Sequence, residues 1–250
     1  TDEKQGIDFL LEGINSLKRN GIDIEKDICG FMLETFQGWG AVFYPKSFVS
    51  KISDICKENN ILLTFDEMQA GFARTGKKFG FEHYGVEPDL ICCGKGIASG
   101  LPLSALVGRK DVMDLPEIGN MSSTHSANPI SCIAGITTIE EIKRLNLVYE
   151  SHRKSKILFD ALSKMKEEFS DNISWVLGKG MIAAILFKNP SSDEPDCLSP
   201  SKICELAMQQ GLLLVHTGRE SIKIGPPLTI SDDALIEGLN VLHKSIKKVC

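Results

Sequence analysis

Apolar residues form two kinds of pattern along the first half of the chain. Leu10, Ile14 and Leu17 follow one another at intervals of four and three. This spacing predicts a helix over residues 6–18. Short continuous apolar runs occupy residues 28–34, 61–65, 90–93 and 105–107. Continuous apolar strands that alternate with helices are typical of a parallel sheet covered on both faces.

Two further helices are marked by residues that favour a helix start. Pro45 favours the first turn of a helix. Phe48, Ile52 and Ile55 then give the segment that follows an apolar face. Ser231 is a good N-cap, and the apolar positions after it follow helical spacing to the end of the chain.

The second half of the chain has a different order of elements. Helical spacing prevails over residues 128–169. Strands are then predicted near 173–177, 181–187, 212–216 and 221–224. A polar loop at 189–199 and a helix near 201–210 separate the first two strands from the last two. We therefore place a domain boundary near residues 150–170. Residues 1–150 are expected to form an α/β domain with a mostly parallel sheet, and residues 151–250 a smaller α+β domain.

Composition limits the class of protein. The 250 residues are 42% hydrophobic and 24% charged, with a formal net charge of −5, which is typical of a globular chain. The absence of a basic excess argues against a nucleic-acid partner, and no apolar run reaches the roughly 18 residues that span a membrane. The eight cysteines include no C-x-x-C pair, and several lie in apolar runs. We therefore expect reduced thiols and a cytoplasmic location.

Two charged side chains follow neighbouring apolar runs. Asp66 comes directly after the run 61–65, and Lys95 lies two residues beyond the run 90–93. Ligands of open α/β sheets bind at the carboxyl ends of the strands, so both groups stand at the ligand-binding edge. The residues around Lys95 are small, which leaves room for a bulky group on its amine. The pair suits either a structural ion pair or a pyridoxal phosphate site, in which a lysine forms a Schiff base and a carboxylate faces the ring nitrogen.

Nucleotide hydrolysis is a rival interpretation. The stretch from Gly71 to Lys77 matches all but the last position of a P-loop, where Lys78 replaces the Ser or Thr that would bind Mg²⁺. A P-loop also needs its own strand before it and a helix after it, and Gly80, Gly85 and Pro88 disfavour a long helix there. No metal site is expected either, because the five histidines form no pair at ligand spacing.

The sequence around these residues resembles a known family. The stretch LTFDEMQAGFARTG (residues 63–76) is followed by FGFEHYGVEPDLICCGKGIASGLPLSALVG (79–108). Together with ETFQGWG (34–40), STHSANP (123–129) and IKIGPPLTI (222–230), it is similar to the class-III aminotransferases of the fold-type-I pyridoxal phosphate enzymes. The resemblance covers nearly the whole chain in the family's order, and it implies that residues 1–150 belong to the large cofactor-binding domain.

The resemblance also implies roles for individual residues. Lys95 is similar to the lysine that forms the Schiff base with pyridoxal 5′-phosphate and carries the proton. Asp66 resembles the carboxylate that pairs with the ring nitrogen, and Gln69 the residue that contacts the ring's O3′. Thr124 is similar to the threonine that reaches the cofactor phosphate of the other subunit, which implies a homodimer. Glu34 resembles a gatekeeping glutamate near the substrate.

Three positions need comment against the family pattern. Trp39 stands where many members have Glu in Q-G-E-G, and Lys223 stands where many have Arg before the Pro-Pro pair. Lys223 is therefore a candidate substrate-binding residue that cannot form the two-pronged carboxylate pair of an arginine. If Lys223 faces the site, this favours ω-amines, or an amino group on a larger molecule, over ordinary α-amino acids; if its neighbours Ile222 and Ile224 pack inward, Lys223 is simply an exposed side chain. Arg74 fits a family loop position and is expected to be structural.

The implied activity is transfer of an amino group from a small-molecule donor to an oxo acid or aldehyde. Other class-III reactions remain open, namely those of aminomutases, racemases and decarboxylases, as does a non-catalytic fragment. The polar N-terminus has no initiator methionine and no signal peptide, so we expect a cut end. We also expect that the 250-residue piece alone binds the cofactor poorly, because nothing in residues 1–60 resembles the phosphate-cradling loop.

Overall fold

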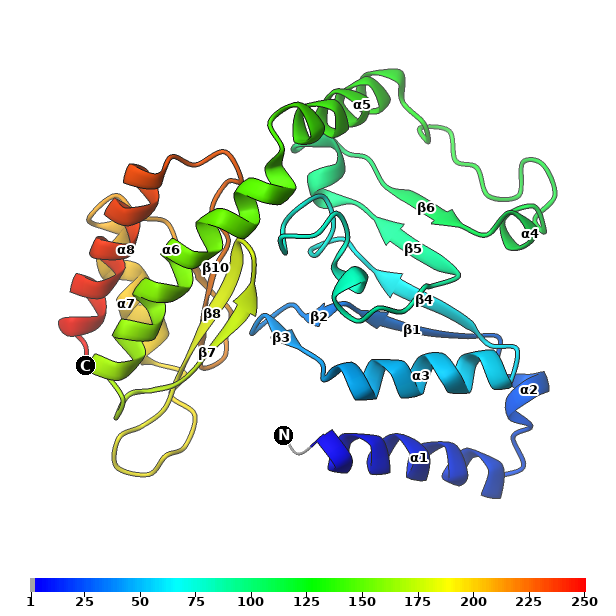
Figure 1. Cartoon of the computed structure of the whole chain (residues 1–250), viewed down its shortest axis with the longest axis horizontal. Helices are drawn as coiled ribbons and strands as arrows, with labels where there is room; N and C mark the ends of the chain where they lie inside the picture. The colour runs from blue at the N-terminus through cyan, green and yellow to red at the C-terminus, as the bar shows by residue number, and fades with distance from the viewer. Residues whose placement is uncertain (1–2) are drawn as a thin grey trace. The chain divides into compact units, whose positions relative to one another are not determined.

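The computed structural model describes residues 3–250 (Figure 1), and their contacts divide the chain into two units. The first unit comprises the chain up to Thr35 together with Tyr44–Gly71 and Phe79–Glu141. The second comprises Phe36–Phe43, Phe72–Lys78 and Ile142–Cys250. Two short segments of the N-terminal half therefore fold with C-terminal residues, which no local sequence pattern indicates.

The first unit is built on a four-stranded sheet in the order β1-β4-β5-β6 (Figure 1). The strands are β1 (Gly30–Glu34), β4 (Leu62–Asp66), β5 (Leu90–Cys93) and β6 (Ala105–Gly108). The first three run parallel, and β6 runs antiparallel to β5. The mostly parallel sheet that the apolar runs predict is confirmed.

Helices cover this sheet and one another. The helix expected over residues 6–18 is α1 (Glu3–Arg19), and the helix after Pro45 is α3 (Lys46–Glu58). The face of α3 that is buried carries Val49, Ile52 and Cys56, whereas Phe48 and Ile55 are only half-buried. The helix α1 packs against α3 as well, so α3 has a second neighbour besides the sheet. Shorter helices are α2 (Ile24–Asp27), η1 (Gly80–His83), η2 (Lys95–Ala98) and α4 (Lys110–Met113), and a longer one is α5 (Pro129–Arg144).

The second unit contains an antiparallel sheet in the order β7-β8-β10-β9. Its strands are β7 (Ile173–Lys179), β8 (Ile182–Phe187), β9 (Val215–His216) and β10 (Ser221–Ile224). A separate hairpin joins β2 (Phe36–Gln37) to β3 (Val42–Phe43). The strand expected over residues 212–216 is therefore shorter than predicted, because only His216 and Val215 find partners on β10.

Three helices complete the core of the second unit. They are α6 (Leu147–Glu168), α7 (Ser199–Met208) and α8 (Asp232–Lys247), and α6 runs through the range where the sequence predicts a domain boundary. Ser231 caps α8 as predicted, since its hydroxyl accepts the Ala234 N–H. The core includes Leu158 and Leu162 of α6, Ile185 and Phe187 of β8, Ile203 of α7, and Leu242 and Ile246 of α8.

The stretch that matches a P-loop in sequence is a turn. Residues 71–79 form turns and bends, and the short 3₁₀ helix η1 follows in place of a long helix. Arg74, in the middle of this stretch, donates to the carbonyl oxygens of Met181 (2.9 Å) and Pro226 (2.6 Å). Burial lowers the pKa of this guanidinium. Arg74 is therefore structural, as expected, and the nucleotide-hydrolase interpretation is wrong.

All eight cysteines, each of which lies in the described part of the chain, have free thiols. Burial raises the pKa of Cys93, on β5, to about 11. Of the helices formed by residues 3–250, none combines the length and the apolar character needed to cross a membrane.

Candidate active site

The carboxyl ends of the three parallel strands meet at one edge of the sheet. In the register of the strands Glu34 lies beside Asp66, and Asp66 lies beside Cys92. Asp66 is the last residue of β4 and is half-buried. One of its carboxylate oxygens accepts the Met68 N–H at 2.8 Å, and no other hydrogen bond to this carboxylate forms among residues 3–250. The second oxygen is therefore available to a ligand.

Lys95 follows β5 at the same edge. It is exposed and begins η2 with φ +45°, a left-handed conformation that lysine rarely adopts. Backbone strain of this kind occurs most often at functional sites. A Cβ on the preceding Gly94 would lie 2.7 Å from Met68 Sδ, whereas a Cβ on Gly96 would meet nothing within 4 Å. Gly94 thus allows the loop after β5 to approach the loop after β4.

Of the other predicted site residues, Gln69 and Glu34 lie at this edge. The amide nitrogen of Gln69 is 3.5 Å from Glu34 Oε1, and both side chains are half-buried. Thr124 is exposed in the segment between α4 and α5. Lys223 belongs to the second unit, where it lies on β10 between the buried Ile222 and Ile224. The structure therefore groups Glu34, Asp66, Gln69 and the start of η2 at one sheet edge.

Glu67 follows Asp66 directly, and the sequence does not show which of these two carboxylates is buried. It is fully buried, and its carboxylate accepts hydrogen bonds from the Thr35 hydroxyl (2.5 Å) and from the backbone N–H groups of Gly80 (2.8 Å) and Phe81 (2.8 Å). Burial raises the pKa of Glu67 above its ordinary value, although all three hydrogen bonds favour the charged form. Glu67 thus ties the end of β4 to η1 and to the residue after Glu34.

Thr35 is held from two more directions. The Tyr84 hydroxyl donates to the Thr35 carbonyl oxygen at 2.6 Å and accepts the Tyr44 N–H at 3.1 Å. Burial raises the pKa of this phenol, so it remains a donor at neutral pH. The Thr35 N–H in turn donates to the Asp66 carbonyl at 3.4 Å. These contacts fix the backbone from which Glu34 and Asp66 project.

We expect Gly80→Ala to destabilise the protein by about 1–3 kcal/mol, because the added methyl group would overpack this junction. Its Cβ would lie 2.6 Å from Thr35 Cγ2 and 2.7 Å from Ala70 Cβ. Gly13→Ala in α1, where a Cβ meets nothing within 4 Å, is the matched control. Denaturant unfolding measures both, and an unchanged midpoint for Gly80→Ala would refute the close packing.

The titration of Glu67 gives a prediction with a definite sign. Because its pKa is raised in the folded state, the neutral form is favoured there. Its contribution to the free energy of unfolding is fully present below the unfolded pKa, about 4.3, and is lost as the pH rises through the folded pKa. The free energy of unfolding of the wild type, minus that of Glu67→Gln, should therefore fall as the pH rises from about 4.3 through the folded pKa. Urea unfolding across this range tests the sign, and a difference that grows with pH would contradict it.

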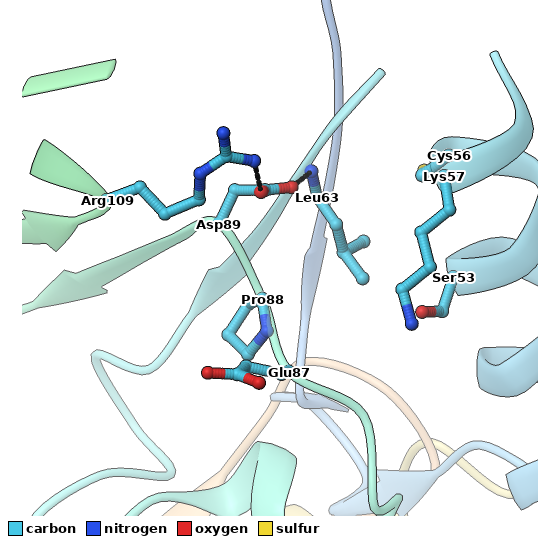
Figure 2. A pocket seen from close by; sticks show the side chains of 8 residues that line it. All are labelled: Ser53, Cys56, Lys57, Leu63, Glu87, Pro88, Asp89 and Arg109. Carbon is cyan, nitrogen blue, oxygen red and sulfur yellow. Dashed lines mark hydrogen bonds and ion pairs between the residues drawn. The ribbon is translucent and has the colours of Figure 1, made fainter. Parts of the chain in front are cut away.

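A cavity of about 370 Å³ lies at the opposite edge of the same sheet (Figure 2). It is lined by Leu63 near the start of β4, by Asp89 directly before β5 and by Arg109 directly after β6, with Lys57 and Ser53 of α3. The Asp89 carboxylate accepts the Leu63 N–H and pairs with Arg109, each at 2.8 Å. The charges of these two strand ends thus neutralise each other, away from Asp66 and Lys95.

Known proteins are similar to this chain in sequence. The family model for class-III aminotransferases matches residues 1–246. A 4-aminobutyrate aminotransferase of Mycobacterium leprae is 36% identical over 221 residues, covering 87% of this chain and 49% of that protein. A 2-aminoadipate transaminase of Pseudomonas putida is 34% identical, covering 90% and 55%.

Solved structures show the same fold. The crystal structure of an acetylornithine aminotransferase from Elizabethkingia anophelis superposes with a TM-score of 0.81 at 30% sequence identity, covering 90% of this chain and 55% of that one. The chain thus spans about half the length of the relatives it matches.

Proposed function

The chain belongs to the class-III aminotransferase family, and from this premise we propose that it carries the cofactor-binding lysine and carboxylate of a pyridoxal-phosphate-dependent aminotransferase. The enzyme would move an amino group from a small-molecule donor to an oxo acid or aldehyde. The observation that carries this proposal is the placement of Asp66 and the strained Lys95 at the carboxyl edge of one parallel sheet.

The residues present suit the cofactor chemically. Lys95 offers an exposed primary amine for covalent attachment, and Gly96 leaves the space beside it open. Asp66 offers one carboxylate oxygen for the ring nitrogen while the other is held by Met68 N–H. Bound pyridoxal phosphate supplies an electron sink for the carbon that bears the substrate's amine.

Each side chain has a separate task in this proposal. The Lys95 amine, once unprotonated, takes a proton from the amine-bearing carbon of the donor and later returns one, as a general base and then acid. The Asp66 carboxylate favours a proton on the ring nitrogen. Gln69, paired with Glu34, would donate to the ring's oxygen, and Thr124 would reach the phosphate of the partner subunit's cofactor in a homodimer.

Lys223 bears on which amino donor the enzyme would use. The relatives are named for 4-aminobutyrate, 2-aminoadipate and acetylornithine, all of which are amino carboxylates. In this chain Lys223 Nζ donates to the Gly38 carbonyl at 3.1 Å, and an ammonium cannot form the fork that holds an α-carboxylate. We therefore propose a donor whose carboxylate is separated from the reacting amine.

We expect the wild type to prefer ω-amino acids to α-amino acids, and Lys223→Arg to lower the KM for α-amino acids by about tenfold, the worth of one added charged hydrogen bond. A donor panel on the intact protein measures both. A wild type that already prefers ordinary α-amino acids, with kinetics unchanged in Lys223→Arg, would show that this position does not set donor choice.

A half-reaction experiment tests the activity itself. The intact protein with bound pyridoxal phosphate is mixed with an amino donor alone, and the visible absorbance of the cofactor is followed. An aminotransferase loses this absorbance with the donor and regains it when an oxo acid is added. A decarboxylase would release carbon dioxide and a racemase would invert the donor, and neither would need the oxo acid to recover.

A further inference from the structure

The cavity between α3 and the start of β4 and β5 contains a buried hydroxyl group without a partner. Ser53 of α3 is 2% exposed, and its Oγ forms no hydrogen bond with any residue in 3–250. A hydroxyl that is buried without a hydrogen bond costs free energy that a bonded one does not. Figure 2 shows this oxygen directed toward the cavity that Ser53 lines. A ligand atom that accepts the hydroxyl proton would remove this cost.

Lys57 places a positive charge beside this hydroxyl. It lies four residues after Ser53, so the two side chains share one face of α3, and both line the cavity. Figure 2 shows the Lys57 ammonium and the Ser53 oxygen on the same side of the cavity. In the part of the chain that the structure describes, Lys57 forms neither an ion pair nor a hydrogen bond. The two groups therefore offer N–H and O–H donors to one anionic acceptor.

The other charges around the cavity do not neutralise Lys57. The Asp89 carboxylate pairs with Arg109 at 2.8 Å and also accepts a backbone N–H. The Glu87 carboxylate points away from Lys57 in Figure 2. The two carboxylates limit the charge of a ligand, because a second negative charge on it would be repelled without gaining another unpaired cation. The cavity thus favours a ligand with one negative charge.

The rest of the cavity wall suits an alkyl chain. Leu63 and Pro88 supply apolar surface, and Figure 2 shows them across from the face of α3 that carries Lys57. Burial, with a smaller effect of the Asp89 carboxylate, raises the pKa of Cys56 to about 11. This thiol is therefore neutral near pH 7 and does not repel an anion. The volume of about 370 Å³ is enough for a small organic molecule.

We propose that this cavity binds a short aliphatic monocarboxylate, with the carboxylate on Lys57 and Ser53 and the alkyl chain on Leu63 and Pro88. The ammonium and the hydroxyl would each donate to a carboxylate oxygen, and the apolar wall would remove the chain from water. The site lies at the edge of the sheet opposite to Lys95, so it is separate from the proposed reaction. It does not depend on the aminotransferase function.

Calorimetric titration of the intact protein with butanoate tests the proposal, and butanamide serves as the neutral ligand of the same shape. Butanoate should bind saturably and butanamide at least about tenfold more weakly, because the amide lacks the charge that Lys57 attracts. Lys57→Gln should weaken butanoate binding about tenfold or more, and Ser53→Ala about threefold to tenfold. Lys51→Gln, in the same helix but outside the cavity wall, is the matched control and should bind butanoate as the wild type does.

A second pair of measurements separates this site from the proposed active site. Lys95→Ala should keep the butanoate affinity of the wild type, and Lys57→Gln should keep the rate of the donor half-reaction. Absence of saturable butanoate binding, equal binding of butanamide, or an unchanged affinity in Lys57→Gln would overturn the cavity assignment. Binding that depends on Lys57 in a protein without any half-reaction would support the cavity assignment and refute only the aminotransferase proposal.

Discussion

Lys95→Ala should abolish amino transfer in the intact protein. The variant removes both the amine that would bond the cofactor and the group that would carry the proton. Loss of a positioned acid–base group alone costs about 10²–10⁴-fold in rate, and loss of the covalent attachment adds to this. The measurement is the rate of the donor half-reaction, followed by cofactor absorbance in stopped flow.

Lys110→Ala is the matched control for this variant. Lys110 lies in the same unit and its side chain is 88% exposed, with an ion pair to Asp114. It should leave the rate unchanged. If Lys95→Ala kept the wild-type rate, Lys95 would not be the group that bonds the cofactor or carries the proton.

Asp66→Asn should lower the rate of the half-reaction by about 10²–10³-fold while the fold is kept. The asparagine oxygen can still accept the Met68 N–H, so the turn after β4 is preserved. In the proposed site this carboxylate would face the ring nitrogen, so loss of its negative charge would remove electrostatic stabilisation of the reacting state. Single-turnover kinetics measures the effect.

Asp66→Glu provides the comparison that separates charge from position. It keeps the charge and shifts it by one methylene, so it should retain more activity than Asp66→Asn. An Asp66→Asn variant at the wild-type rate would show that this carboxylate does not face the cofactor.

The strands that carry the candidate site were predictable because their signal is local. The apolar runs 61–65 and 90–93 lie in the neighbouring parallel strands β4 and β5. The rule that ligands bind at the carboxyl ends of such strands then points to Asp66 and Lys95. These assignments rest on where each apolar run ends, which a short sequence window shows.

Other features depend on partners distant in the sequence. Asp66 and Glu67 look equivalent as an Asp-Glu pair, and only the approach of Gly80 and Phe81 shows that Glu67 is the buried one. The turn around Arg74 folds with the second unit because of Met181, which lies 107 residues further along the chain. No periodicity in the sequence encodes such contacts.

Covalent attachment of the cofactor to Lys95 is the step on which the proposed function most directly depends. The intact protein is incubated with pyridoxal phosphate, reduced with borohydride, digested and examined by peptide mass spectrometry. We predict a single pyridoxyl-modified peptide whose modification maps to Lys95. Modification of another lysine in its place, or no stable adduct at saturating cofactor, would contradict the account.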